Sequence, residues 1–502
     1  MMAVNNKLIL VLCSFLFLVG CTAGRLTFDP GKKLSREQLQ HDFQVMRNIL
    51  EEGHPSLYWY SSRDSLDEVF DRAYANISDS MTEPQFRTLL SYVISKVNCG
   101  HTSLRYSKKY YRYLDTVRLK QFPLSLKLWG DSAIVYANLH RTDSILKRGT
   151  IINSINNKPL VFYRDSLFQY LTMDGYGINH KYQTLSNRGN FGGWYRNVFG
   201  LRAQFTIGYL NRMGEEKSMV IPVFDPATDS LANVNSLRSP QGGARERRRM
   251  AIASSRDLKI DTSSSTAWVA LNTFSRGNGL SSFLRKTFKT LHRQQIQNFV
   301  LDLRSNGGGN VGMSTLLTRY LINHRFKLAD SLYAVNKKSN YGKYIQHYLW
   351  NQLFMNIITK KRSDGKYHFG YFTRHFFNPK KKNHFNGNTY LIIGGNSFSA
   401  TTLFANALKG QENVLLVGEE TGGGAYGNSA WLIPDVTLPN SRLRMRLPKF
   451  RMVISKAAVK DGRGVQPDVF VGPSLESIRN GIDPKMEKVR ELIKTKNNTV
   501  RH

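Results

Sequence analysis

Two serines lie between an apolar run and a helical pattern in residues 389–410, and this stretch constrains the fold most strongly. Tyr390–Ile393 is apolar, contains β-branched residues and precedes two glycines, which predicts a buried strand entering a tight turn. From Ala400, apolar residues recur at i, i+3, i+4, i+7 and i+8 until Gly410, so a helix follows the turn. A hydroxyl on such a turn lies beside free helix N–H groups, as a nucleophile and an oxyanion require. Many such units carry serines without catalysing anything, so the unit alone assigns no chemistry.

Strands and helices alternate through this half of the chain. Trp268–Phe274 and Asn298–Leu303 predict strands, and Leu280–Leu291 and Met313–Ile322 predict helices. Such alternation implies a parallel or mixed sheet with helices packed against it. The glycines at 307–309 lack the residues of a phosphate-binding loop, but their N–H groups can approach a ligand closely.

Residues 32–115 predict a helical domain. Ser35 with Gln38, and Thr82 with Gln85, form capping boxes before apolar stripes at helical spacing. The last of these helices leads to a histidine, His101, on a glycine turn. Taken alone, this residue is typical of a structural histidine held by hydrogen bonds.

A β-rich module is predicted after the helical domain. Phe122–Leu128 and Ala133–Leu139 alternate apolar and polar residues around a Gly-Asp turn, which indicates a hairpin. The segment Arg148–Leu160 resembles the strand and turn of PDZ domains, which bind an extended peptide at a sheet edge. Residues 175–202 do not fit that pattern and look like an insertion.

The first residues predict export and lipid attachment. Lys7 precedes the apolar run Leu8–Val19, which is too short to span a membrane and fits a signal peptide. Leu18–Cys21 resembles the lipobox of bacterial lipoproteins, in which the cysteine is acylated, although an ordinary signal peptide remains an alternative. Cys13 would be removed with the signal and Cys99 would stand alone, so no disulfide is expected. The predicted location is the bacterial cell envelope, with the lipid-anchored chain facing the periplasm or the cell surface.

The chain is strongly basic. It has 71 Lys and Arg against 36 Asp and Glu, a formal net charge of +35. Such a charge suits nucleic acid or another polyanion, but no nucleic-acid-binding motif is present. Solvated lysines on an extracytoplasmic protein are the favoured explanation, so no nucleic-acid partner is expected. A cluster at Arg245–Arg249 is expected in an exposed linker. No metal or cofactor signature is present.

With 502 residues the chain needs more than one domain. The fold class expected is a multidomain α+β and α/β architecture. The predicted divisions are a signal peptide at 1–20, a tether at 21–31, a helical domain at 32–115, a PDZ-like module at 116–224, a basic linker at 225–260, a mixed α/β core at 261–484 and a basic tail at 485–502.

Four separated blocks together resemble the tail-specific, or C-terminal processing, serine peptidases. They are Gly100–Thr102, Asp302–Gly309, Val417–Gly424 after the serine elbow, and Asp461–Asp468. The resemblance implies a peptidase core of crotonase-like ββα units, a protein or peptide substrate, and cleavage through an acyl-enzyme.

The resemblance also assigns roles to single residues. It places Ser399 at the nucleophile position, with Ser397 as the alternative. Where one branch of the family keeps a catalytic lysine, this chain has Gly424, so a Ser-Lys dyad is excluded there. The branch that includes the tricorn core uses a histidine, and its position matches His101 as general base.

Three further site residues follow from the resemblance. Asp461 occupies the place of an acid that would assist the site electrostatically, or it merely caps a turn. The N–H groups of Gly308 and Ala400 would bind the oxyanion. Because Gly100 replaces a serine that helps to orient the histidine, a catalytically inactive, ligand-binding lipoprotein is the alternative function. The natural substrate and the oligomeric state stay open.

Overall fold

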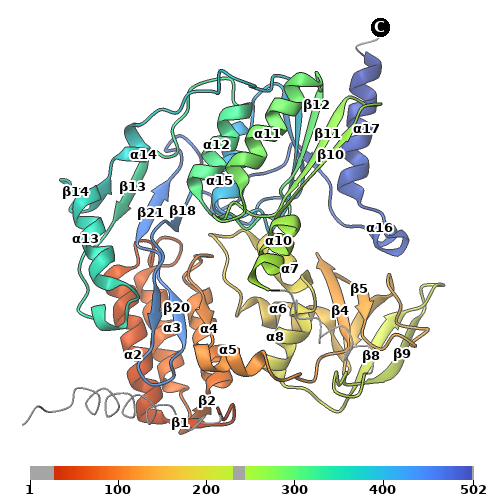
Figure 1. Cartoon of the computed structure of the whole chain (residues 1–502). Helices are drawn as coiled ribbons and strands as arrows, with labels where there is room; N and C mark the ends of the chain where they lie inside the picture. Colours follow the sequence, from red (N-terminus) through yellow and green to blue (C-terminus); the bar gives the residue numbers. More distant parts are fainter. Residues whose placement is uncertain (1–27, 230–242, 500–502) are drawn as a thin grey trace, which may run out of the picture.

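The computed structural model describes residues 28–229 and 243–499. In Figure 1 a helical module lies at the lower left, a β-rich module at the lower right and an α/β core above both. This confirms the expected multidomain α+β architecture. The predicted signal peptide and lipobox lie outside the described residues. In the described part of the chain, no helix is both long and apolar enough to cross a bilayer.

The helical module is built on capped helices. The side-chain oxygen of Ser35 accepts the N–H of Gln38, and the N–H of Thr82 donates to the side chain of Gln85 at 2.9 Å, as predicted. Apolar side chains of these helices form one buried core. The elements are β1 (Lys33–Ser35), α2 (Arg36–Gly53), α3 (Arg63–Ala75), β2 (Ser80–Thr82), α4 (Glu83–Ser95), β3 (Leu104–Arg105) and α5 (Lys108–Leu114).

The β-rich module is an antiparallel sheet in the order β4-β5-β6-β8-β9, with β7 paired to β6. The stretch expected to be an insertion holds two helices, and one of them, α7, packs against β4 and reaches the core. The resemblance to PDZ domains stays a prediction. The elements are β4 (Leu124–Trp129), β5 (Ser132–Asn138), β6 (Ile151–Ile155), β7 (Lys158–Pro159), α6 (Leu160–Phe168), α7 (Ile178–Ser186), α8 (Asn190–Phe199), β8 (Gln204–Leu210) and β9 (Glu216–Pro222).

The core is a six-stranded sheet in the order β10-β11-β12-β16-β17-β22, parallel except for β10. Its buried apolar residues form the largest core cluster of the protein's described part. The elements are α10 (Ala244–Ser255), β10 (Arg256–Asp261), β11 (Thr266–Leu271), α11 (Leu280–Arg293), β12 (Asn298–Asp302), α12 (Val311–Leu321), β16 (Asn388–Ile393), α15 (Ala400–Leu408), β17 (Val414–Gly418), β22 (Val469–Phe470), α16 (Leu475–Asn480) and α17 (Pro484–Thr499).

The stretch expected to be a linker contains regular structure. The arginine cluster lies on helix α10, and β10 extends the core sheet by pairing antiparallel with β11. The alternating pattern of β10, Arg-Asp-Leu-Lys-Ile-Asp, suits an edge strand that places only its apolar residues against the core. The charges that suggested a linker are therefore the exposed faces of this helix and this edge strand.

A second sheet, β14-β15-β13-β21-β18, lies beside the core, and a small third sheet, β19-β20-β3, joins the core to the helical module. The pairing of β3 with β20 fixes the segment that follows α4. The elements are β13 (Ser331–Ala334), η1 (Gly342–Tyr344), α13 (Tyr348–Ile358), β14 (Thr359–Lys361), β15 (Tyr367–Phe369), α14 (Tyr371–Arg374), β18 (Gly427–Ala430), β19 (Asp435–Thr437), β20 (Arg444–Arg446) and β21 (Phe450–Val453).

Candidate active site

Ser399 lies on the turn between β16 and α15, where it is the N-cap of the helix. Its backbone has φ 57° and ψ −121°, a conformation that a residue with a Cβ adopts only under strain. The backbone of Gly308, in the loop between β12 and α12, runs so close that a Cβ on this glycine would lie 2.8 Å from the Cβ of Ser399. The strained turn therefore needs the glycine beside it, and it presents the serine at the end of the sheet.

The two serines of the elbow have different environments. Ser397 is fully buried; its hydroxyl donates to the carbonyl of Leu303 at 2.9 Å and accepts the N–H of Gly394 at 3.2 Å. These bonds tie the turn to the end of β12. Ser399 instead lines a pocket that it shares with His101. The geometry thus favours Ser399 over the alternative, Ser397.

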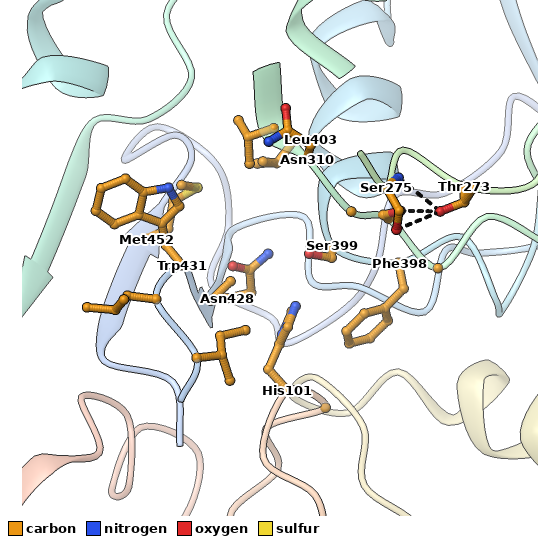
Figure 2. A pocket seen from close by; sticks show the side chains of 18 of the residues that line it. His101, Thr273, Ser275, Asn310, Phe398, Ser399, Leu403, Asn428, Trp431 and Met452 are labelled. Atoms are coloured by element: carbon orange, nitrogen blue, oxygen red, sulfur yellow. Dashed lines mark hydrogen bonds between the residues drawn. The ribbon is translucent and has the colours of Figure 1, made fainter. Parts of the chain in front are cut away.

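His101 is held by its neighbours on the turn after α4. The carbonyl of Ser103 accepts the N–H of Arg446, and the hydroxyl of Thr102 lies 2.8 Å from Nε2 of His54. The imidazole itself is buried, points toward Ser399 and Asn428 (Figure 2), and has no hydrogen-bond partner for either ring nitrogen among the described residues. It is therefore free to exchange a proton with a group in the pocket.

An aspartate that the sequence analysis missed faces this histidine. A carboxylate oxygen of Asp174 lies 3.9 Å from Nδ1 of His101, and both side chains are buried. The carboxylate accepts the N–H groups of Gly100 at 2.8 Å and Gly424 at 3.4 Å. Burial opposes its ionisation, but His101 and the two N–H groups outweigh burial and lower the pKa of Asp174 below its ordinary value. The site thus holds a buried carboxylate that stays charged.

Asp461 lies elsewhere, which corrects the expectation that it assists the site. Its exposed carboxylate accepts the N–H of Arg463 at 2.8 Å and so closes a turn. The next residue, Gly462, accepts the N–H of Tyr176 through its carbonyl at 2.8 Å. The block that suggested a catalytic acid therefore supports the loop that carries one, Asp174.

Of the two expected oxyanion donors, the structure leaves one N–H group available and the other occupied. Ala400 is the first residue of α15, and its N–H has no hydrogen-bond partner within the described chain. The N–H of Gly308 is not available, because it donates to the side chain of Asn306 at 2.9 Å. The carbonyl of Gly308 accepts the N–H of Phe274, and in a trans peptide the N–H of Gly309 must point the opposite way. Gly309 therefore replaces Gly308 as the second candidate donor.

Residues 265–471 match the family model described as peptidase family S41. The chain has the core of this family. A serine-type peptidase core thus occupies this part of the chain. No curated protein matches the sequence.

Solved structures with a similar fold include mature CPAF complexed with lactacystin, at 14% identity and a TM-score of 0.64 over 92% of this chain and 98% of that chain. Mature CPAF alone matches at 14% identity and a TM-score of 0.61, over 91% of this chain and 97% of that chain. At this identity the likeness shows that the whole fold is shared.

Two glycines at which this chain departs from the patterns that the sequence resemblance implied have structural reasons. A Cβ on Gly100 would lie 2.4 Å from the ring of Phe398, so a serine does not fit there. A Cβ on Gly424 would lie 2.7 Å from the carbonyl oxygen of Gly427, and its N–H already serves Asp174. A lysine is therefore excluded by space as well as by sequence.

The pocket of the S41 core has a volume of about 930 Å³. Leu403, Trp431 and Met452 give it an apolar wall. Asn428 lines it too, and both polar atoms of its buried amide lack a hydrogen-bond partner among the described residues. A buried amide without partners is costly, so this one is available to a ligand. No metal-binding group of three or more His, Cys, Asp or Glu occurs in the described ranges.

Proposed function

We propose that this peptidase cleaves peptide bonds with Ser399 as nucleophile and His101 as general base. The observation that carries the proposal is that two side chains line one pocket: a serine on a strained elbow, and a buried histidine whose ring nitrogens have no hydrogen-bond partner in the described part of the chain. A histidine can accept a proton near neutral pH without the large pKa shift that a buried lysine needs.

His101 takes the proton of Ser399 as its hydroxyl attacks the scissile carbonyl, and an acyl-enzyme forms when the same proton passes to the leaving amine. Asp174 would hold the ring through Nδ1 once the 3.9 Å contact closes to hydrogen-bond range, which leaves Nε2 for the serine. In the second half of the reaction His101 activates the water that releases the acyl group.

The oxyanion would receive the N–H groups of Ala400 and Gly309. Each donor is expected to contribute about 3–4 kcal/mol to the stabilisation of the transition state. The amide of Asn428 would bind the main chain of the substrate, because it can donate to a carbonyl and accept an N–H at the same time. The apolar wall of the pocket would take a substrate side chain.

Ser399→Ala tests this proposal. We expect it to lose casein hydrolysis by a factor of about 10⁴ or more, and to lose labelling by a fluorophosphonate probe, because the acylated atom is gone. Ser275→Ala is the matched control, since Ser275 also lines the pocket but lies on another segment. Undiminished hydrolysis by Ser399→Ala would exclude Ser399 as the nucleophile.

We also propose that the protein is a lipoprotein of the bacterial cell envelope, anchored through Cys21. The support is the lipobox-like Leu18–Cys21 after a short apolar run. Incorporation of radiolabelled palmitate should be lost in Cys21→Ser, and the chain should then leave the membrane fraction. Equal labelling of that variant would contradict the anchor.

A further inference from the structure

Helix α13 presents an apolar face to solvent. Leu349, Trp350 and Ile357 are 76%, 73% and 75% exposed, and Leu353 and Phe354 are exposed beside them. At the angular spacing of an α-helix these five side chains fall within an arc of about 140°. A soluble helix normally turns such a stripe toward the core.

The opposite side of α13 packs against the protein interior. Met355 is fully buried and belongs to the apolar cluster around β13 and β21, and Ile358 packs against that cluster. The apolar residues of the exposed face are therefore not needed to pack α13 against the rest of the protein. In Figure 1 the helix lies at the left margin of the molecule. Contiguous exposed apolar surface of this kind marks a site of interaction.

In the sequence around this helix nearly all charged residues are positive. Glu52 of the helical module reaches the segment before the helix, where it accepts the hydroxyl of Ser339 and the N–H of Asn340. Residues 331–387 contain 11 Lys and Arg but a single acid, Asp364, and α13 itself carries no charged residue. Lys343 precedes the helix, and Lys360–Arg362 follow it, all exposed. The carboxylate of Asp364 lies 2.9 Å from the ring of His368, so it is already engaged.

We infer that the α13 face docks onto the surface of a bilayer that contains anionic lipid headgroups. Trp, Leu, Phe and Ile on one side with Lys and Arg at the ends is the composition of a helix that lies in the interface of a membrane. Each nearby Lys or Arg adds to the attraction toward an anionic surface. A second copy of this chain would instead bring the same positive charges together. The inference rests on neither the proposed catalytic residues nor the proposed lipid anchor.

Docking in this manner places the pocket near the lipid. The ring of Phe354 lies 6.0 Å from that of Trp431, and Trp431 lines the pocket. Only the thickness of one helix, roughly 10 Å, would separate the pocket wall from the headgroups. Peptide segments close to the membrane surface would then be the accessible substrates.

The test uses residues 22–502, a chain that carries no covalent lipid anchor. It measures how much of this protein sediments with vesicles of phosphatidylcholine and phosphatidylglycerol. This chain keeps every described element and removes the apolar run at 8–19, which would bind lipid by itself. We expect Trp350→Glu combined with Ile357→Glu to reduce the bound fraction about tenfold or more. The matched control is Met213→Glu combined with Val220→Glu, two exposed apolar residues of the β-rich module, which should bind like the wild type.

Two further measurements test the contribution of charge to membrane binding and check that the variants are folded. Lys360→Glu combined with Lys361→Glu should weaken binding about tenfold on anionic vesicles, and the wild type should bind pure phosphatidylcholine more weakly. Hydrolysis of a soluble peptide should be unchanged in all variants, which shows that they fold. Wild-type protein that does not sediment with anionic vesicles, or an α13 variant that binds like the control, would overturn the inference. So would light scattering that shows a dimer which the α13 variant turns into a monomer.

Discussion

The serine elbow and the turn that carries His101 are built by different means. The elbow is contiguous in sequence, because β16, the turn and α15 follow one another and Ser397 ties them to the neighbouring strand. The histidine turn depends on distant partners, namely strand β20 of the third sheet and the loop of Asp174. The nucleophile is thus a local property of the core, whereas the base and its acid exist only where modules meet.

The largest effect that sharpens this comparison is expected from Asp174→Asn. The neutral amide fills the same space but no longer stabilises the imidazolium, so kcat should fall by a factor of about 10²–10⁴. Labelling by a reactive probe should slow in parallel, and the melting temperature should also fall, because the amide nitrogen cannot accept the N–H that one carboxylate oxygen now accepts. The pKa of Asp174 is lowered in the folded protein. Protonation of Asp174 should therefore not reduce the wild-type kcat until the pH falls below the ordinary pKa of an aspartate. A wild-type kcat in this variant would show that Asp174 does not contribute to catalysis.

A smaller effect of another kind is expected from Ser397→Ala in the elbow. It leaves the carbonyl of Leu303 and the N–H of Gly394 without their buried partner, which should lower the free energy of unfolding by about 1–3 kcal/mol. Urea denaturation measures this change. The labelled residue should still be Ser399. Loss of labelling with an intact fold would show that the two serines had been assigned the wrong way round.

An effect on stability alone, seen only below pH 6.5, is expected from His54, which contacts the histidine turn through Thr102. Burial, with Arg451 and Lys449 nearby, lowers the pKa of His54 to about 3. The unfolded chain therefore binds the proton first, so the stability from neutral His54 is complete above pH 6.5 and is lost as the pH falls toward 3. The loss should approach roughly 1.4 kcal/mol per pH unit. In His54→Gln this part of the slope should vanish in urea titrations at pH 4 and pH 6.5; an unchanged slope would contradict it.

The same contrast explains what could be predicted from the sequence. The elbow, the strand–helix alternation and the capping boxes are local patterns, and the structure contains them. Asp174 could not be found, because Met-Asp-Gly reads as an ordinary turn and only packing brings it to His101. Asp461 was assigned to the site because its segment is part of the motif, but it only closes a turn next to Gly462, which hydrogen-bonds to the loop of Asp174. The exchange of Gly308 for Gly309 depends on the direction of one peptide plane, which composition does not encode.

The most direct test of the account is the rate at which a fluorophosphonate labels Ser399 in His101→Gln and in wild-type protein. The account requires His101 to take the proton of Ser399, so the variant should react about 10²-fold to 10⁴-fold more slowly at neutral pH, with an unchanged fold. Labelling of Ser399 at the wild-type rate without this imidazole would contradict it.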